Sequence, residues 1–224
     1  MISIIVPVYN EEEALTSGAE QWKRLSARSE LIFADGGSTD RSEAISQDLG
    51  AFVRGPRGRA PQMNTAAAVS RGEILLFLHA DTMIDPCTLE NISRAVKDRG
   101  YAGGCLTQRI KGDAAAYRLI EAQGNIRARL SGVYYGDQGI FVKRDIFSRM
   151  GGFPEVSVME DVLFSRKMRK TGTVKMLRDR IFVSNRRWAK RGMVRTTLMY
   201  STISLLFCLG VSTESIKNIY EDVR

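Results

Sequence analysis

The run Leu75-Leu76-Phe77-Leu78-His79-Ala80-Asp81-Thr82 constrains the fold most strongly, because an unbroken apolar segment ends abruptly at a histidine and a carboxylate. Buried strands of parallel sheets have such continuous apolar sequences, and open α/β sheets bind ligands where these strands end. An oxygen ligand at Asp81 would suit a hard divalent cation that already carries phosphate oxygens. The alternative is that Asp81 and Thr82 simply cap a turn. The run by itself favours neither interpretation.

The size and charge of the chain limit its class. Its 224 residues suffice for one well-buried domain, or for one domain with an appendage. The 33 Lys and Arg residues outnumber the 25 Asp and Glu residues, which gives a formal charge of +8. This balance favours anionic partners such as nucleotide phosphates, nucleic acid or an anionic membrane surface, and does not choose among them.

The sequence also predicts a compartment. Cys87, Cys105 and Cys208 are widely spaced, which is typical of ordinary thiols in a reducing environment. Residues 1–7 lack the basic region and cleavage site of a signal peptide, and no stretch of about 18 consecutive apolar residues exists. We therefore expect a cytoplasmic protein without a transmembrane helix.

Strand-like and helix-like patterns alternate through the first hundred residues, which predicts a parallel sheet with right-handed crossovers. After residue 101 the pattern is less regular. We predict one α/β domain over residues 1–190, with a nucleotide-binding half (1–100) and an acceptor half (101–190), followed by a helical tail (191–224). The expected elements are residues 2–8, 11–27, 31–34, 42–49, 51–53, 61–70, 74–78, 88–97, 101–110, 114–130, 139–142 and 160–170.

Polar residues follow the first two predicted strands, at the sheet edge where Asp81 is expected. Tyr9 could stack on a base, and Asp35 could accept hydrogen bonds from base or ribose groups. Residues 35–40 could instead form a turn with a helix N-cap. Residues 54–64 contain three arginines around two glycines and lead into a helix, which suits a pyrophosphate better than a solvated basic loop.

These segments together resemble family 2 glycosyltransferases of the GT-A fold, which invert the anomeric carbon. The resemblance covers roughly the first 190 residues, and the nearest group is the short bacterial type associated with radical-SAM and selenodomain proteins. It implies a mostly parallel central sheet with C-terminal helices, a UDP- or GDP-linked sugar donor, a hydroxyl acceptor, and Mg²⁺ or Mn²⁺. The segments are Val6-Pro7-Val8-Tyr9-Asn10-Glu11, Asp35-Gly36-Gly37-Ser38-Thr39-Asp40, His79-Ala80-Asp81 and Met159-Glu160-Asp161.

The resemblance also implies roles for residues. Asp81 matches the last aspartate of the metal-binding DxD motif, and Asp161 matches the general base, with Glu160 in support. His79 replaces the first aspartate of DxD, so we expect the ion to arrive largely with the nucleotide. Gly36 stands where many relatives have a second aspartate. The implied donor-nucleotide residues are Pro7, Tyr9, Glu11, Asp35, Arg59, Gln62 and Ala80.

The chemistry of sugar transfer gives a second reason to assign Asp161 as the general base. A sugar hydroxyl is a poor nucleophile, and inverting displacement needs one base opposite the leaving diphosphate, for which a carboxylate suffices. Glu160 and Asp161 could instead stabilise the N-terminus of a helix, because the helix dipole favours negative charge there. With the other segments present, we assign catalysis to Asp161.

The acceptor side is less defined. The segment Tyr134–Gly139 suits a carbohydrate or polyol, although it could equally be a hairpin turn. Arg187 and Trp188 resemble the family's QxxRW element, but Ser184 stands where Gln would be, which argues against a processive polysaccharide synthase. The predicted acceptor residues are Tyr135, Gly136, Asp137, Gln138, Arg187 and Trp188.

The tail combines a basic lead-in from Arg186 with an apolar stretch over residues 196–211. It could lie on the inner face of an anionic membrane, or it could be a helix docked on the core. A nucleotidyltransferase of similar fold is the main alternative function. A basic nucleic-acid or membrane-binding module ranks last, and we expect no nucleic-acid partner, because acidic groups at three strand ends oppose phosphate-backbone binding.

Overall fold

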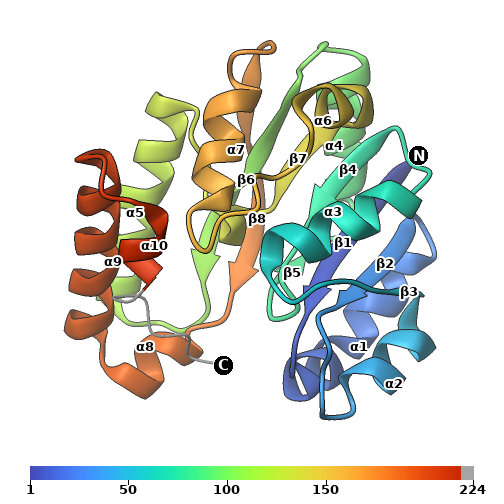
Figure 1. Cartoon of the computed structure of the whole chain (residues 1–224), viewed down its shortest axis with the longest axis horizontal. Coiled ribbons are helices and arrows are strands. Elements are labelled where there is room, and N and C mark those ends of the chain that lie inside the picture. Colours follow the sequence, from blue (N-terminus) through green and yellow to red (C-terminus); the bar gives the residue numbers. More distant parts are fainter. Residues whose placement is uncertain (218–224) are drawn as a thin grey trace.

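The computed structural model describes residues 1–217, except for the side chains of Arg187 and Lys190. It shows a central sheet with helices on both faces (Figure 1). The strands are β1 Ile2–Val8, β2 Glu30–Asp35, β3 Ala51–Arg54, β4 Ile74–Phe77, β5 Met83–Ile84, β6 Gly103–Ile110, β7 Ile140–Lys143 and β8 Val174–Val183. The helices are α1 Glu12–Ser26, α2 Ser42–Leu49, α3 Arg59–Val69, α4 Thr88–Lys97, α5 Ala115–Ser131, the 3₁₀ turn η1 Gly136–Gln138, α6 Arg144–Met150, α7 Glu160–Met168, α8 Arg186–Arg191, α9 Met193–Cys208 and α10 Thr213–Lys217.

The sheet has eight strands in the order β3-β2-β1-β4-β7-β6-β8-β5. Strands β3, β2, β1 and β4 are parallel, β7 runs antiparallel to both β4 and β6, and β8 is parallel to β6. The predicted mostly parallel α/β fold with C-terminal helices is therefore confirmed. The chain moves outward from β1 to β3 and then returns to place β4 on the other side of β1. The carboxyl ends of β1 and β4, at this reversal, are where such sheets bind ligands.

Two apolar layers hold the sheet. Alternate residues of β1, such as Ile4 and Val6, pack with α1, α2 and α4 on one face. Ile5 points to the other face, where α3, α6 and α7 pack. On the first face the fully buried Trp22 meets Phe33 edge to face, with ring centroids 5.7 Å apart. These layers fix the strand ends that carry the polar loops.

Strand β8 and helix α6 are among the elements that the sequence pattern did not show. Strand β8 is rich in charged residues on its exposed positions, so its period-two pattern is weak. Helix α6 has only seven residues. The segment at residues 134–139 is no hairpin turn, because η1 joins helix α5 to β7.

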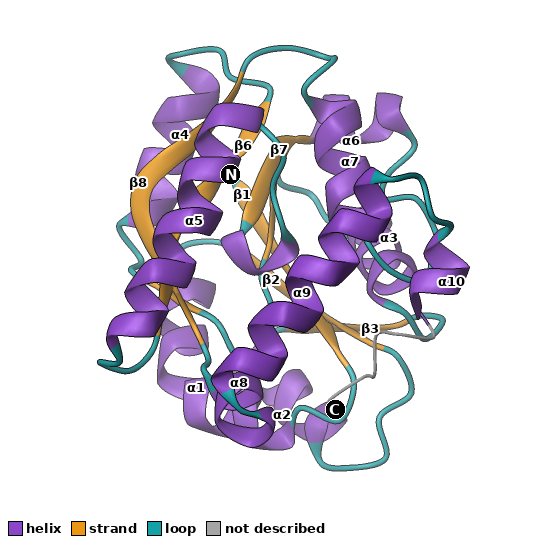
Figure 2. Ribbon diagram, turned by 90° about the vertical axis from the view of Figure 1, so that its left-hand side faces the viewer, coloured by secondary structure: helices purple, strands orange, loops and turns teal. Residues whose placement is uncertain are grey.

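The tail is folded onto the body of the protein. Figure 2 shows α9 beside α5, with α8 at its lower end. Ile203 of α9 is buried against Val158, and Tyr200 packs on Trp188 with ring centroids 6.3 Å apart. Over residues 1–217 every helix is too short or too polar to cross a bilayer.

We predict that Gly104→Ala lowers the free energy of unfolding by about 1 to 3 kcal/mol, because an added Cβ would overlap the carbonyl oxygen of Lys175 on the neighbouring strand. Urea unfolding measures the change. The control is Gly124→Ala in α5, where a Cβ would meet only Gln108, at 3.4 Å. Alanine is the better helix former, so this control should gain up to about 1 kcal/mol. Equal stability of the two variants would contradict the close approach at Gly104.

Candidate active site

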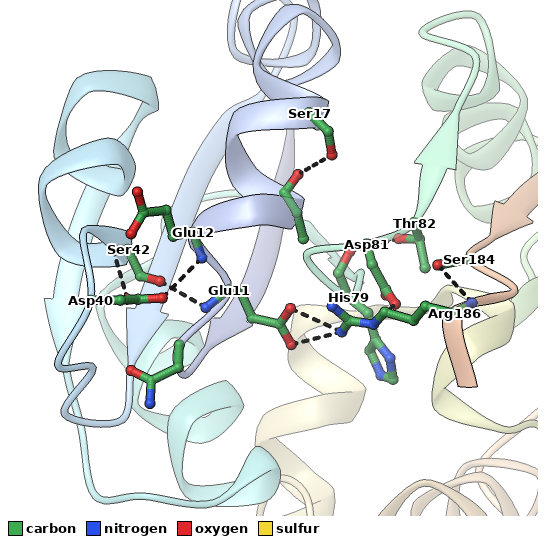
Figure 3. Close-up of polar contacts among 12 residues, drawn as sticks. Glu11, Glu12, Ser17, Asp40, Ser42, His79, Asp81, Thr82, Ser184 and Arg186 are labelled. Atoms are coloured by element: carbon green, nitrogen blue, oxygen red, sulfur yellow. Dashed lines mark hydrogen bonds and ion pairs between the residues drawn. The ribbon is translucent and has the colours of Figure 1, made fainter. Parts of the chain in front are cut away.

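The loops after β1 and β2 are bonded to each other. The backbone N–H of Glu11 donates to Oγ of Ser42 at 2.8 Å, and that of Glu12 donates to Oδ2 of Asp40 at 3.1 Å (Figure 3). The same Asp40 accepts a bond from the N–H of Ser42 at 2.9 Å. These bonds satisfy the first N–H groups of two helices and fix the direction of the Glu11 side chain.

Asp40 titrates below its usual range. Burial alone would raise the pKa of this carboxyl, but hydrogen bonds from Ser42 and from the N–H of Glu12 outweigh burial and lower the pKa. The carboxylate form is therefore the one that stabilises the two loops.

Three predicted donor residues lie inside the framework of the site. Asp35 is 1% exposed, and its Oδ2 accepts bonds from the N–H groups of Gly37 at 2.8 Å and Ser38 at 3.0 Å. It shapes the loop, and its contact with base or ribose stays a prediction. Pro7 and Ala80 are also buried, so they form the base of the site more than its surface.

Gln62, another predicted donor residue, also lies inside the framework of the site. The sequence predicts a donor contact, but the residue is fully buried and its Nε2 donates to the carbonyl oxygens of Val8 at 2.6 Å and Ala34 at 2.7 Å. The amide thus joins the ends of β1 and β2 to helix α3. A Cβ at Gly36 would lie 3.0 Å from the Gln62 side chain, so a larger residue at this position would require Gln62 to shift.

Tyr9 extends from the end of β1 and is half-buried. The guanidinium carbon of Arg57 lies 4.1 Å from its ring centroid, a cation–π distance. The loop that contains Arg57 and leads into α3 therefore approaches the end of β1.

A cavity of about 390 Å³ lies between the sheet edge and the helices α5 and α9. Its polar end includes His79, Asp81 and Asp161. Its other wall includes Ile120, Trp188, Tyr200 and Ile203. The cavity brings together the predicted residues Arg59, Asp81, Tyr135, Gly136, Asp137, Glu160, Asp161 and Trp188.

Asp161 stands at the start of α7 and is held from the acceptor side. Its Oδ2 accepts a bond from the N–H of Gly136 at 2.6 Å. A Cβ on Gly136 would lie 3.0 Å from Nε2 of His79 and 3.4 Å from Oδ2 of Asp161, so a larger residue here would require the His79 ring to shift by a few tenths of an ångström. The residue before Glu160, Met159, has φ +66°, a conformation that is costly for a side chain of this kind and that turns the chain into α7.

Glu160 points away from solvent. It is 3% exposed, and its Oε1 lies 3.2 Å from Nε of Arg59. Arg59 opens α3 and was predicted to bind pyrophosphate. The ion pair joins the donor-side helix to the helix that carries Asp161.

Side-chain hydrogen bonds hold the segment that is predicted to contact the acceptor. The Tyr135 hydroxyl pairs with Oγ of Ser204 on α9 at 2.9 Å, and Oδ2 of Asp137 accepts from Gln108 at 2.6 Å. Gln138 is 1% exposed, and its Oε1 accepts the N–H of Tyr135 at 3.1 Å. Gln138 therefore supports the loop, and its contact with the acceptor stays a prediction. The side chain of Arg187 lies outside the described part of the structure.

Arg186 belongs to the basic lead-in of the tail, which the sequence left open between a membrane face and a solvated segment beside a docked helix. The structure points it into the site, where it bridges two strand ends (Figure 3). Its Nη2 lies 2.9 and 3.0 Å from the carboxylate oxygens of Glu11, and its Nε lies 3.1 Å from Oδ2 of Asp81. Its position beside the Arg187-Trp188 element was the one available signal.

The family model for glycosyl transferase family 2 matches residues 3–153. The chain belongs to glycosyltransferase family 2. This membership replaces the nucleotidyltransferase and binding-module alternatives. No curated protein matches the sequence.

Solved glycosyltransferase structures share the fold of this family 2 glycosyltransferase. S. aureus TarS, residues 1–349, superposes with a TM-score of 0.64 at 18% identity, covering 82% of this chain and 60% of that one. The mannosyltransferase PcManGT from Pyrobaculum calidifontis, in complex with GDP-Man and Mn²⁺, gives 0.66 at 22% identity, covering 81% and 56%. The chain thus spans a little over half the length of these structures. At such identities the likeness shows the GT-A fold and not the substrates.

We predict that Asp40→Asn lowers the free energy of unfolding at neutral pH by about 1 to 3 kcal/mol, because charge-assisted hydrogen bonds from two helix starts are weakened. A carboxyl with a lowered pKa stabilises the fold above its unfolded pKa, and this contribution is lost as the pH falls through the folded pKa. Urea unfolding from pH 7 to pH 3 should show the two proteins converging in acid. Asp48→Asn, at an exposed site on α2, is the control. A difference that is constant with pH would contradict the role of the charge.

Proposed function

We propose that this glycosyltransferase moves a sugar from a UDP- or GDP-linked donor to a hydroxyl acceptor, with inversion at the anomeric carbon. The observation that carries the proposal is the shared cavity of Asp81 and Asp161, one following β4 and the other opening α7. Inverting transfer needs a base on one side of the sugar and the leaving diphosphate on the other. A cavity with a carboxylate from each half of the protein meets that need.

The donor side uses the carboxyl ends of β1 and β4. Tyr9 offers a ring for the base, while Arg57 and Arg59 carry positive charge near the start of α3, where a diphosphate is favoured. The neighbouring structures include TarS with UDP-GlcNAc and PcManGT with GDP-Man. Both complexes support a nucleotide-sugar donor here, and neither selects the base.

A divalent cation, Mg²⁺ or Mn²⁺, is part of the proposal. Glu11 and Asp81 supply carboxylate oxygens that suit such ions, and they already hold a positive group, Arg186. Residues 1–217 contain no group of three or more His, Cys, Asp or Glu side chains arranged for a metal, so the diphosphate and water must supply the other ligands. The bound ion would neutralise charge on the departing diphosphate. PcManGT, which is similar in fold, is in complex with Mn²⁺.

The base is Asp161. The N–H of Gly136 holds one of its oxygens, which orients the carboxylate toward the cavity. It takes the proton from the acceptor hydroxyl as the sugar bond forms. Glu160 supports the site through its ion pair with Arg59, which joins α3 on the donor side to α7. The space for the acceptor is lined by Tyr135, Asp137 and Trp188. The polar groups of this lining suit a carbohydrate or polyol.

We predict that Asp161→Asn keeps donor affinity but lowers turnover by about 10² to 10⁴, because the amide keeps the shape of the carboxylate and cannot accept the proton. Release of UDP or GDP from a panel of nucleotide sugars measures turnover, and calorimetry measures affinity. Asp145→Asn, at an exposed site on α6, is the matched control. Near-normal turnover of Asp161→Asn at saturating substrates would reject this assignment.

Peripheral membrane contact is the second part of the proposal. Leu119, Ile126 and Leu130 on α5 and Val194, Leu198 and Leu205 on α9 have exposed side chains. These helices also wall the cavity, so an acceptor at a membrane would reach it from this side. Arg195 is exposed on α9, whereas Arg186 is engaged in the donor site and does not contribute.

We predict weak binding to vesicles that contain anionic phosphatidylglycerol, falling with salt because the attraction is screened. The double variant Leu198→Ser/Leu205→Ser should bind about tenfold or more weakly, since each buried leucine contributes about 1.5 to 3 kcal/mol. The control is Val69→Ser, which removes an exposed apolar side chain on α3. Vesicle sedimentation gives the affinity. Equal binding to anionic and phosphatidylcholine vesicles at low salt would leave α9 as a purely structural helix.

A further inference from the structure

Arg186 joins the two strand ends of the proposed donor site. It is the first residue of α8 and reaches back to Glu11 after β1 and Asp81 after β4 (Figure 3). The side chains of Glu11 and Asp81 are 10% and 18% exposed, and that of Arg186 is 32% exposed. The three charged groups are therefore only partly hydrated, and their attraction is stronger than that of a surface pair.

The Asp81 carboxylate has two possible cationic partners, the Arg186 guanidinium and the proposed metal ion. Oδ2 of Asp81, which Nε of Arg186 contacts at 3.1 Å, belongs to the carboxylate proposed for the metal. A guanidinium and a divalent ion repel each other, so both cannot hold this oxygen closely at once. Since His79 stands where relatives have another acid, the site has few anionic groups with which to displace Arg186.

A nucleotide diphosphate changes this balance. Its charge adds ligands for the ion, and it also offers the arginine a new partner, because the planar guanidinium pairs well with phosphate oxygens. We propose that Arg186 is a donor-binding residue that guards Asp81: it pairs with Asp81 and Glu11 in the absence of donor, and it exchanges Asp81 for the diphosphate when a metal-bound nucleotide enters. This exchange rests on the proposed function of the site.

The exchange predicts opposite effects on two ligands. In Arg186→Gln the competitor for Asp81 is gone, so Mn²⁺ alone should bind several-fold more tightly than to the unmodified protein. The same variant should bind UDP or GDP in the presence of Mn²⁺ about 10-fold to 100-fold more weakly, because a charge-assisted bond to the diphosphate is missing. A purely structural arginine would not separate the two affinities in this way.

Paramagnetic resonance of unbound Mn²⁺ measures the first affinity, and calorimetry with UDP and GDP measures the second. Arg186→Lys keeps the charge but not the planar fork, so both of its affinities should lie between those of the other two proteins. Arg195→Gln, at an exposed site on α9, controls for loss of one positive charge. A misfolded protein cannot gain affinity for Mn²⁺, so a gain also shows that the site is intact.

Three results would overturn the inference. The two affinities of Arg186→Gln could change in the same direction, or neither could change. Alternatively, the unmodified protein could bind the nucleotide equally well in EDTA while Arg186→Gln does not, and Arg186 would then replace the metal permanently. Failure of the unmodified protein to bind either nucleotide would instead overturn the proposed function. This outcome can be told apart from failure of the inference, in which the unmodified protein binds the nucleotide and Arg186→Gln binds it equally well.

Discussion

The site depends on the balance of negative charge gathered at one edge of the sheet. Parallel strands bring Glu11 and Asp81 to the same edge, and Glu160 is buried nearby at the start of α7. Partly buried carboxylates are costly unless cations neutralise them, and two arginines do so here. Arg59 pairs with Glu160, and Arg186 pairs with both Glu11 and Asp81. Each arginine comes from a distant part of the chain, so the charge balance also joins the donor half to the C-terminal half.

Backbone shape is the second constraint on the site. Asp161 reaches the cavity because Met159 adopts a left-handed conformation and because Gly136 has no side chain to separate His79 from the carboxylate. On the donor side, Gln62 fills the space beside Gly36 and satisfies the carbonyl groups at two strand ends. Such features fix the positions of carboxylates to within the tolerance that proton transfer and ion binding need.

Much of the fold and part of the site could be predicted from the sequence. Apolar runs such as Leu75–Leu78 predict buried parallel strands, and their order places Asp81 and Glu11 at one edge. Buried amides could not be recognised, because a glutamine that bonds to backbone carbonyls looks in sequence like one that faces a ligand, as Gln62 and Gln138 show. The partners of Arg186 could not be predicted for a related reason: a run of basic residues indicates charge but not direction, and the side chain found its partners 105 and more residues earlier in the chain.

The division between the two halves also bears on specificity. The family match ends at residue 153, before Asp161, Arg186 and the whole of α9. The proposed donor features thus lie mainly in the part shared with the family, whereas the wall of the cavity proposed for the acceptor is formed largely by α5 and α9. Helix α8 contacts both regions. Its first residue, Arg186, pairs with Glu11 and Asp81, and Trp188, two residues later, lines the cavity and packs on Tyr117 and Tyr200. One short helix therefore connects the charge of the proposed donor site to the packing of the proposed acceptor cavity.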